Sequence, residues 1–174
     1  MLFLKVFILI TLLLIFIQDW KNRAVFWFFF PLLAVSLFFL NYLTHTGTEG
    51  IWQPSLINIG FLTIQLLLVT AYFSIKAKRP VNITRNLLGL GDILFLWSIA
   101  FYLSVLNFLF FYIASLVCVL LFWMFYQLIA SKKDKQIPLA GIQALLFTVL
   151  LAIDWWFLNV HLNDDMWLLK LITK

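Results

Sequence analysis

Apolar stretches of about twenty residues follow one another along almost the whole chain, separated by short polar breaks. A helix needs about twenty apolar residues to cross the hydrocarbon core of a bilayer, so each stretch is long enough for one crossing. Hydrophobic residues make up 65% of the 174 positions and charged residues only 11%, whereas soluble domains contain roughly 25% charged residues. These proportions exclude a soluble single-domain enzyme. They predict an all-α, polytopic bundle of membrane helices that forms one domain over residues 1–174.

The polar breaks divide the chain into six predicted spans. The spans cover approximately residues 2–18, 24–43, 55–75, 87–105, 107–130 and 139–160. The apolar run from Leu87 to Ala130 is too long for one crossing, and we place its turn at Asn107. The first stretch has one early Lys5 and no small-residue cleavage site, so we expect a permanent helix rather than a signal peptide.

The basic residues predict how the spans are oriented, because Lys and Arg concentrate in the cytoplasmic loops of membrane proteins. Nine of the twelve basic residues fall in the loops after the first, third and fifth spans. These nine are Lys21, Arg23, Lys76, Lys78, Arg79, Arg85, Lys132, Lys133 and Lys135. We therefore expect these loops in the cytoplasm and both termini outside. The net charge of +5 then reflects membrane orientation, and no nucleic-acid partner is expected.

Three acidic residues lie on or inside predicted spans: Asp19, Asp92 and Asp154. An acidic side chain near a helix centre costs about 2.5 to 3.5 kcal/mol to insert, and marks a functional site or a pairing. The alternation of spans places Asp19 and Asp92 at the cytoplasmic face. Asp154 lies toward the outer end of the last span with no second acid at its depth, so we interpret it as structural. The adjacent pair Asp164 and Asp165 is expected in solvent.

Two glycines precede the second of these acids in the sequence Gly89-Leu90-Gly91-Asp92. Glycines let a neighbouring backbone approach closely, which serves either a site or simple helix packing. If Asp19 and Asp92 approach within several ångströms, their mutual repulsion favours a pair that shares one proton. Such a pair can act as in aspartic proteases, where one carboxylate takes a proton from water and the other polarises the scissile carbonyl.

Metal ligands are scarce in this sequence. Cys118 is the only cysteine, which excludes a disulfide framework and a paired-cysteine zinc site. His45 and His161 have no cluster of ligands near them in the sequence. We therefore predict neither a metal nor a cofactor.

The sequence resembles the type IV prepilin peptidases, which are membrane aspartic peptidases with a GxGD motif. Three segments carry the resemblance. Asp19 is followed by the basic residues Lys21 and Arg23, Gly89-Leu90-Gly91-Asp92 matches the GxGD box, and Ile137-Pro138-Leu139-Ala140-Gly141 is similar to the proline-containing start of the family's last helix.

The resemblance implies an aspartic endopeptidase that cleaves the leader of a pilin-like precursor at the cytoplasmic face of a prokaryotic inner membrane. Cleavage is implied next to a glycine, between a basic leader and an apolar helix that lies in the bilayer. The implied catalytic residues are Asp19 and Asp92, and the residues that shape the site are Gly89, Gly91, Lys21, Arg23 and Pro138. Leu94 stands where the family commonly has a lysine. The chain lacks the cysteine-containing segment that long members associate with methylation, so we expect peptidase activity alone.

Two other interpretations stay open. A small transporter or an assembly subunit could use Asp19 and Asp92 to pair with basic residues or to pass cations. No inverted repeat, which many transporters contain, is visible in the sequence. An inactive member of the same family could also bind a precursor without cleaving it.

Overall fold

The computed structural model describes residues 1–44, 52–78, 89–129, 137–158, 162–165 and 167. The described part contains six α-helices and one short π-helical turn. The elements are α1 (Leu2–Asn22), α2 (Phe29–Thr44), α3 (Trp52–Ala77), α5 (Leu90–Ile99), α6 (Val105–Ile129), α7 (Leu139–Ile153) and the π-helical turn η2 (Asp154–Leu158). Within these described residues, four segments are long and apolar enough to cross a membrane: α1, α3, α6, and α7 together with its π-helical turn. The predicted all-α bundle of membrane helices is confirmed.

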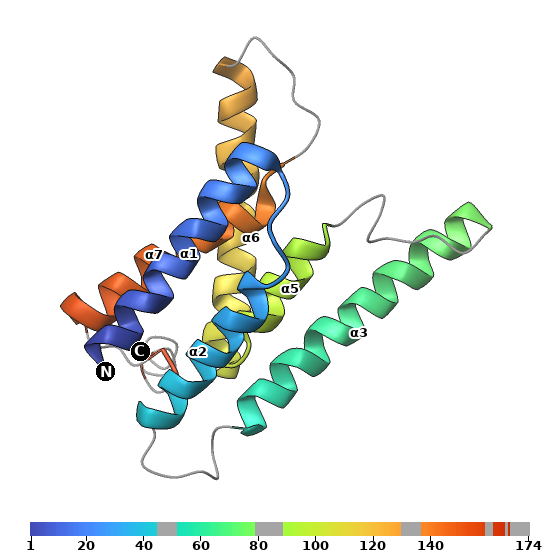
Figure 1. Ribbon diagram of the computed structural model, residues 1–174. Coiled ribbons are helices and arrows are strands. Elements are labelled where there is room, and N and C mark those ends of the chain that lie inside the picture. Colours follow the sequence, from blue (N-terminus) through green and yellow to red (C-terminus); the bar gives the residue numbers. More distant parts are fainter. Residues whose placement is uncertain (45–51, 79–88, 130–136, 159–161, 166, 168–174) are drawn as a thin grey trace.

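The helices pack side by side, and α5 contacts α2, α3 and α7 (Figure 1). α1 lies beside α7 along much of its length, and α2 packs against α5. α3 stands at the edge of the bundle. Only 11% of its most apolar stretch is buried, compared with 44% for the span that contains α7. α3 therefore presents most of its surface to lipid.

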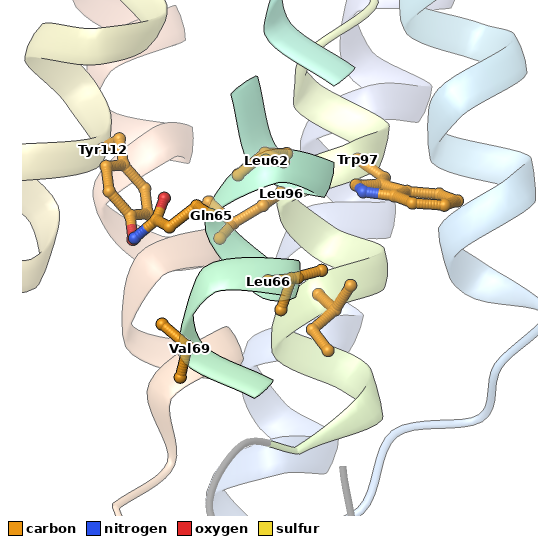
Figure 2. Close-up of a pocket in the computed structure, with 8 residues that line it drawn as sticks. Leu62, Gln65, Leu66, Val69, Leu96, Trp97 and Tyr112 are labelled. Carbon is orange, nitrogen blue, oxygen red and sulfur yellow. The ribbon is translucent and has the colours of Figure 1, made fainter. Parts of the chain in front are cut away.

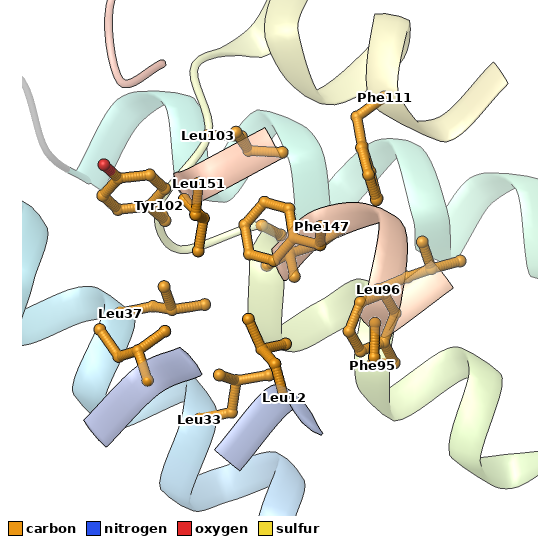
Figure 3. Packing of buried hydrophobic residues seen from close by; sticks show 14 of the residues in the cluster. Leu12, Leu33, Leu37, Phe95, Leu96, Tyr102, Leu103, Phe111, Phe147 and Leu151 are labelled. Carbon is orange, nitrogen blue, oxygen red and sulfur yellow. The ribbon is translucent and has the colours of Figure 1, made fainter. Parts of the chain in front are cut away.

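The hydrophobic core joins α1, α2, α5, α6 and α7 (Figure 3). Phe95 of α5 and Phe147 of α7 are fully buried, and their rings meet edge to face with centroids 6.4 Å apart. Phe111 of α6 packs on Phe147 at 5.2 Å. Leu12 of α1 and Leu33 of α2 are also fully buried. Because aromatic pairs in this geometry attract each other beyond their buried area, these rings hold α5, α6 and α7 in a fixed relation.

The turn between α5 and α6 differs from the prediction. α5 ends at Ile99 and α6 begins at Val105, so the predicted break at Asn107 is wrong and that residue lies in the first turn of α6. α5 has only 10 residues, which corresponds to about 15 Å, or half of the hydrocarbon core. The fourth predicted span is therefore shorter than its apolar sequence indicated.

Two buried asparagines explain why α5 can end inside an apolar run. The turn that follows α5 also exposes backbone carbonyls, and in lipid, where no water is available, each of them must find a donor. Asn58 Nδ2 of α3 donates to the Leu103 carbonyl at 2.9 Å. Asn41 Nδ2 of α2 donates to the Phe101 carbonyl at 3.0 Å. Hydropathy does not detect these partners, because they lie more than forty residues away in the sequence.

The segment near the C-terminus closes the same turn. Asp165 Oδ1 accepts a hydrogen bond from the Leu106 amide at 3.1 Å and another from the Ser104 hydroxyl. Asn107 Nδ2 donates to the Leu162 carbonyl at 3.0 Å. The prediction that Asp165 lies free in solvent is therefore wrong, because this carboxylate caps the start of α6.

The connection between α1 and α2 lies further along the chain than predicted, because α1 continues to Asn22 rather than ending near residue 18, and α2 begins at Phe29 rather than near residue 24. The Phe26 amide donates to Gln18 Oε1 at 3.2 Å. Phe26, Trp27 and Phe28 are exposed, as expected for aromatic side chains at a membrane interface.

The orientation in the membrane stays a prediction from the basic residues. Lys21, Arg23, Lys76 and Lys78 belong to the described residues. The other five of the nine lie outside them: Arg79, Arg85, Lys132, Lys133 and Lys135.

Candidate active site

The candidate site is built on the first turn of α7. Pro138 is the residue that caps the start of this helix, with φ −75° and ψ 73°. The first amides of a helix have no intrahelical acceptor, so they are free to bind other groups. The Leu139 amide bonds to the Ile137 carbonyl at 2.9 Å. The next two amides, of Ala140 and Gly141, point to the two acids that the sequence singled out.

Asp19 lies in the last turn of α1, and it is only 8% exposed. Its Oδ2 accepts a hydrogen bond from the Gly141 amide at 2.6 Å. A Cβ atom at position 141 would lie 2.9 Å from Asp19 Cβ and 3.0 Å from Oδ2. These contacts are too short for any side chain, so glycine is needed here for the carboxylate to reach the backbone.

Asp92 lies in the first turn of α5 and is half-buried. Its Oδ1 accepts from the Ala140 amide at 2.8 Å, and its Oδ2 accepts from the Gly89 amide at 3.2 Å. Gly89 is extended, with φ −65° and ψ 138°, and caps the start of α5. Gly91 lies against the ring of Phe30, which a Cβ atom would approach to 3.4 Å. The two glycines thus have separate roles in hydrogen bonding and in packing.

Two carboxylates from distant parts of the sequence therefore bind successive amides of one helix end. Successive Cα atoms are about 3.8 Å apart, so Asp19 and Asp92 meet within a few ångströms at the start of α7. The partial positive charge of a helix start favours carboxylates, whereas their like charges repel. A pair held in this way is suited to share a proton and to act as general acid and general base.

The remaining predicted site residues lie around this pair. Pro138 sets the start of α7 and thereby the position of the two amides. Arg23 ends α1 in a left-handed conformation with φ 51°, its amide donates to the Asp19 carbonyl at 2.9 Å, and its guanidinium lies 5.9 Å from the centre of the Trp123 ring. Lys21 is exposed in the last turn of α1.

The amides of Ala140 and Gly141 are site groups that we did not identify from the sequence. A backbone amide carries no residue signature, so composition and motif both overlook it. The available signal was the pairing of Pro138, which starts a helix, with a glycine three residues later.

Asp154 lies at the opposite end of α7, where it is 5% exposed. It follows Ala140 by fourteen residues, or about 21 Å along the helix axis. It therefore takes no part in the site. Within the described residues no three His, Cys, Asp or Glu side chains gather as they would around a metal ion. His45 and His161 lie outside the described residues.

Comparison with known proteins identifies no relative of this chain. No protein-family model matches this chain, and neither a curated protein nor a solved structure is significantly similar to it.

Proposed function

We propose that this chain is a membrane aspartic endopeptidase of the prepilin-peptidase type, with Asp19 and Asp92 as its catalytic pair. The observation that carries the proposal is the convergence of these two carboxylates on the successive amides of Ala140 and Gly141. A pair of acids is costly to place within a membrane bundle, and a purely structural role requires neither that they meet nor that they share one helix end.

The pair would use water as its nucleophile. The ionised carboxylate removes a proton from a water molecule, whose oxygen attacks the carbonyl carbon of the scissile peptide bond while the protonated carboxyl bonds to the carbonyl oxygen. A proton then passes to the leaving nitrogen as the carbon–nitrogen bond breaks, and the pair returns to one shared proton. Within the part of the chain that the structure describes, Asp19 Oδ1 takes no hydrogen bond, so this oxygen is available to bind the water.

The proposed substrate is a pilin-like precursor, in which a basic leader and a glycine precede an apolar helix. This assignment rests on the resemblance described above. It is consistent with the chemistry of the surface, because the exposed helices accept an apolar partner in lipid and the site lies at an end of the bundle. A glycine near the cleaved bond helps the peptide to become extended and accessible there.

The test is cleavage of a synthetic precursor by the purified chain in liposomes, followed by mass spectrometry. Asp19→Asn and Asp92→Asn preserve side-chain size and an oxygen acceptor but cannot carry out the proton transfer. Each should lower kcat/KM by about 10³-fold or more. Asp154→Asn is the matched control, because it changes a buried acid away from the site and should leave cleavage near the native rate.

Unchanged cleavage in either Asp19→Asn or Asp92→Asn would refute the catalytic pair. The same liposomes also test the transporter alternative. Cation flux that needs both acids, in a chain that cleaves no precursor, would replace the peptidase proposal with a carrier.

A further inference from the structure

An apolar cavity of about 50 Å³ lies between α3, α5 and α6 (Figure 2). It is outside the catalytic pair and none of the steps above uses it. Its walls include Gln65, Leu66, Val69, Ile93, Leu96 and Tyr112.

One end of the cavity lies at the depth of the catalytic site, on a different face of α5. Ile93 directly follows Asp92, and Leu96 lies on the same face of α5 one turn further along the helix. The cavity therefore starts at the depth of the Asp92 carboxylate and continues along α5, away from the end of the bundle where the pair lies. A precursor cleaved at Asp92 would run its apolar helix in this same direction.

The cavity can be reached from lipid. Leu66, Val69 and Ile93 are half-buried rather than sealed in the core. α3, which forms one wall, is the least buried of the four long spans. A side chain that projects from a helix in the bilayer can therefore enter between α3 and α5.

A polar atom without a partner lies in this otherwise apolar wall. Gln65 Nε2 donates to the Tyr112 hydroxyl, and Figure 2 shows the two side chains together. Gln65 Oε1 is buried and has no hydrogen-bond partner among the described residues. An unsatisfied buried acceptor costs about 1–3 kcal/mol, so a donor on an occupant would bind here favourably. The first four amides at the start of any helix are donors that lack intrahelical partners.

We infer that this cavity is a specificity pocket that receives one apolar side chain from the first two turns of the precursor's helix, with Gln65 Oε1 accepting a hydrogen bond from an amide at the start of that helix. The inference rests on the proposed function. The size fits: an apolar cavity of about 150 Å³ binds benzene, so 50 Å³ accommodates an aliphatic side chain rather than a whole helix. The rest of the helix then lies in lipid along the seam of α3 and α5.

The first experiment scans the substrate. Synthetic precursors carry a basic leader, a glycine and an apolar helix of about twenty Leu and Ala residues, with Leu replaced by Ala at one position at a time from position 2 to 8 after the cleaved bond. One position should lower kcat/KM about tenfold when Leu is shortened to Ala, the usual effect of an emptied apolar pocket.

The second experiment fills the pocket. Val69→Trp should abolish the preference for Leu at that position, so that the Leu and Ala peptides are cleaved at similar rates. Leu68→Trp is the matched control, because Leu68 directly precedes Val69 on α3 and is 66% exposed. The Leu68→Trp variant should keep the native preference for Leu. Gln65→Met, which removes the acceptor and retains the length, should lower kcat/KM for every peptide by about fivefold.

A binding measurement separates the pocket from the catalysis. In the Asp92→Asn chain, a photoreactive side chain at Leu66 should crosslink to the precursor helix, whereas the same group at Leu68 should not. Suppose first that the native chain cleaves the precursors. A flat scan, or equal behaviour of Val69→Trp and Leu68→Trp, then refutes the pocket and leaves the peptidase proposal intact.

If the native chain cleaves nothing, the proposed function fails. Crosslinking at Leu66 alone would in that case still support a docking pocket, and equal crosslinking at Leu66 and Leu68 would refute the pocket.

Discussion

Gly141→Ala is the substitution that most directly tests how the site is held. An added Cβ atom would lie 2.9 Å from Asp19 Cβ and 3.0 Å from its Oδ2. Asp19 Cβ is fixed to the backbone of α1, so the contact is relieved only if α1 and α7 separate or the carboxylate turns away. Either movement breaks the 2.6 Å hydrogen bond from the Gly141 amide.

The magnitude follows from two opposing effects. Losing a hydrogen bond to a carboxylate costs about 1.5–3 kcal/mol, whereas alanine in place of glycine within a helix stabilises by up to about 1 kcal/mol. We expect a net loss of about 0.5–2 kcal/mol in unfolding free energy. Because a displacement of about 1 Å at a reacting group costs roughly 100-fold in rate, kcat/KM for the precursor should fall by about that factor.

The assay compares Gly141→Ala with Gly60→Ala in detergent, by thermal unfolding and by precursor cleavage. Gly60 also lies in a helix, but an added Cβ atom there meets nothing within 4 Å. Gly60→Ala should therefore be neutral or slightly stabilising and should cleave at the native rate. If the two variants are equally stable and equally active, the close approach of Asp19 to the α7 backbone does not exist as described.

Three further predictions concern stability in detergent, measured as the melting temperature. Asn58→Leu removes the donor to the Leu103 carbonyl and should destabilise the protein by about 1–3 kcal/mol. Thr63→Leu, on the exposed side of α3, is the control and should not destabilise the protein. Equal melting temperatures of the two variants would contradict this role of Asn58. Asp165→Ala removes the cap of α6 and should cost about 0.5–2 kcal/mol, with faster hydrogen exchange at the Leu106 amide; unchanged exchange there would count against the cap. Lys78→Gly should stabilise the protein by about 1 kcal/mol, because Lys78 ends α3 with φ 51°, a left-handed conformation that glycine adopts without strain. A lower melting temperature of this variant would contradict this reasoning.

The helices could be predicted where hydropathy alone decides them. The long spans of α1, α3 and α6 agree with their apolar runs to within a few residues. α5 could not be predicted in this way, because its early end depends on Asn41 and Asn58 of other helices. Hydropathy measures how well a segment fits lipid and carries no information on which distant side chain will satisfy a given carbonyl.

The candidate site, too, could be predicted from the sequence only in part. Asp19 and Asp92 could be found because an acid in an apolar span is conspicuous, and the alternation of spans predicted that they lie at one depth. Their shared support could not be found, because it consists of backbone amides at Ala140 and Gly141. The need for glycine at position 141 arises from a residue 122 positions earlier, so no local pattern reveals it.

The order in which the chain is synthesised has a consequence for the Asp19 carboxylate. Its amide partner belongs to α7, 122 residues further along the chain. At roughly 5–20 residues per second, the ribosome needs about 6–24 seconds to make the intervening segment. During that interval α1 already contains its acid, while the helix start that orders it has not been made. A chain released after Asp92 but before Ala140 therefore holds both carboxylates without their common support, and the ordered pair can form only once the start of α7 has been made.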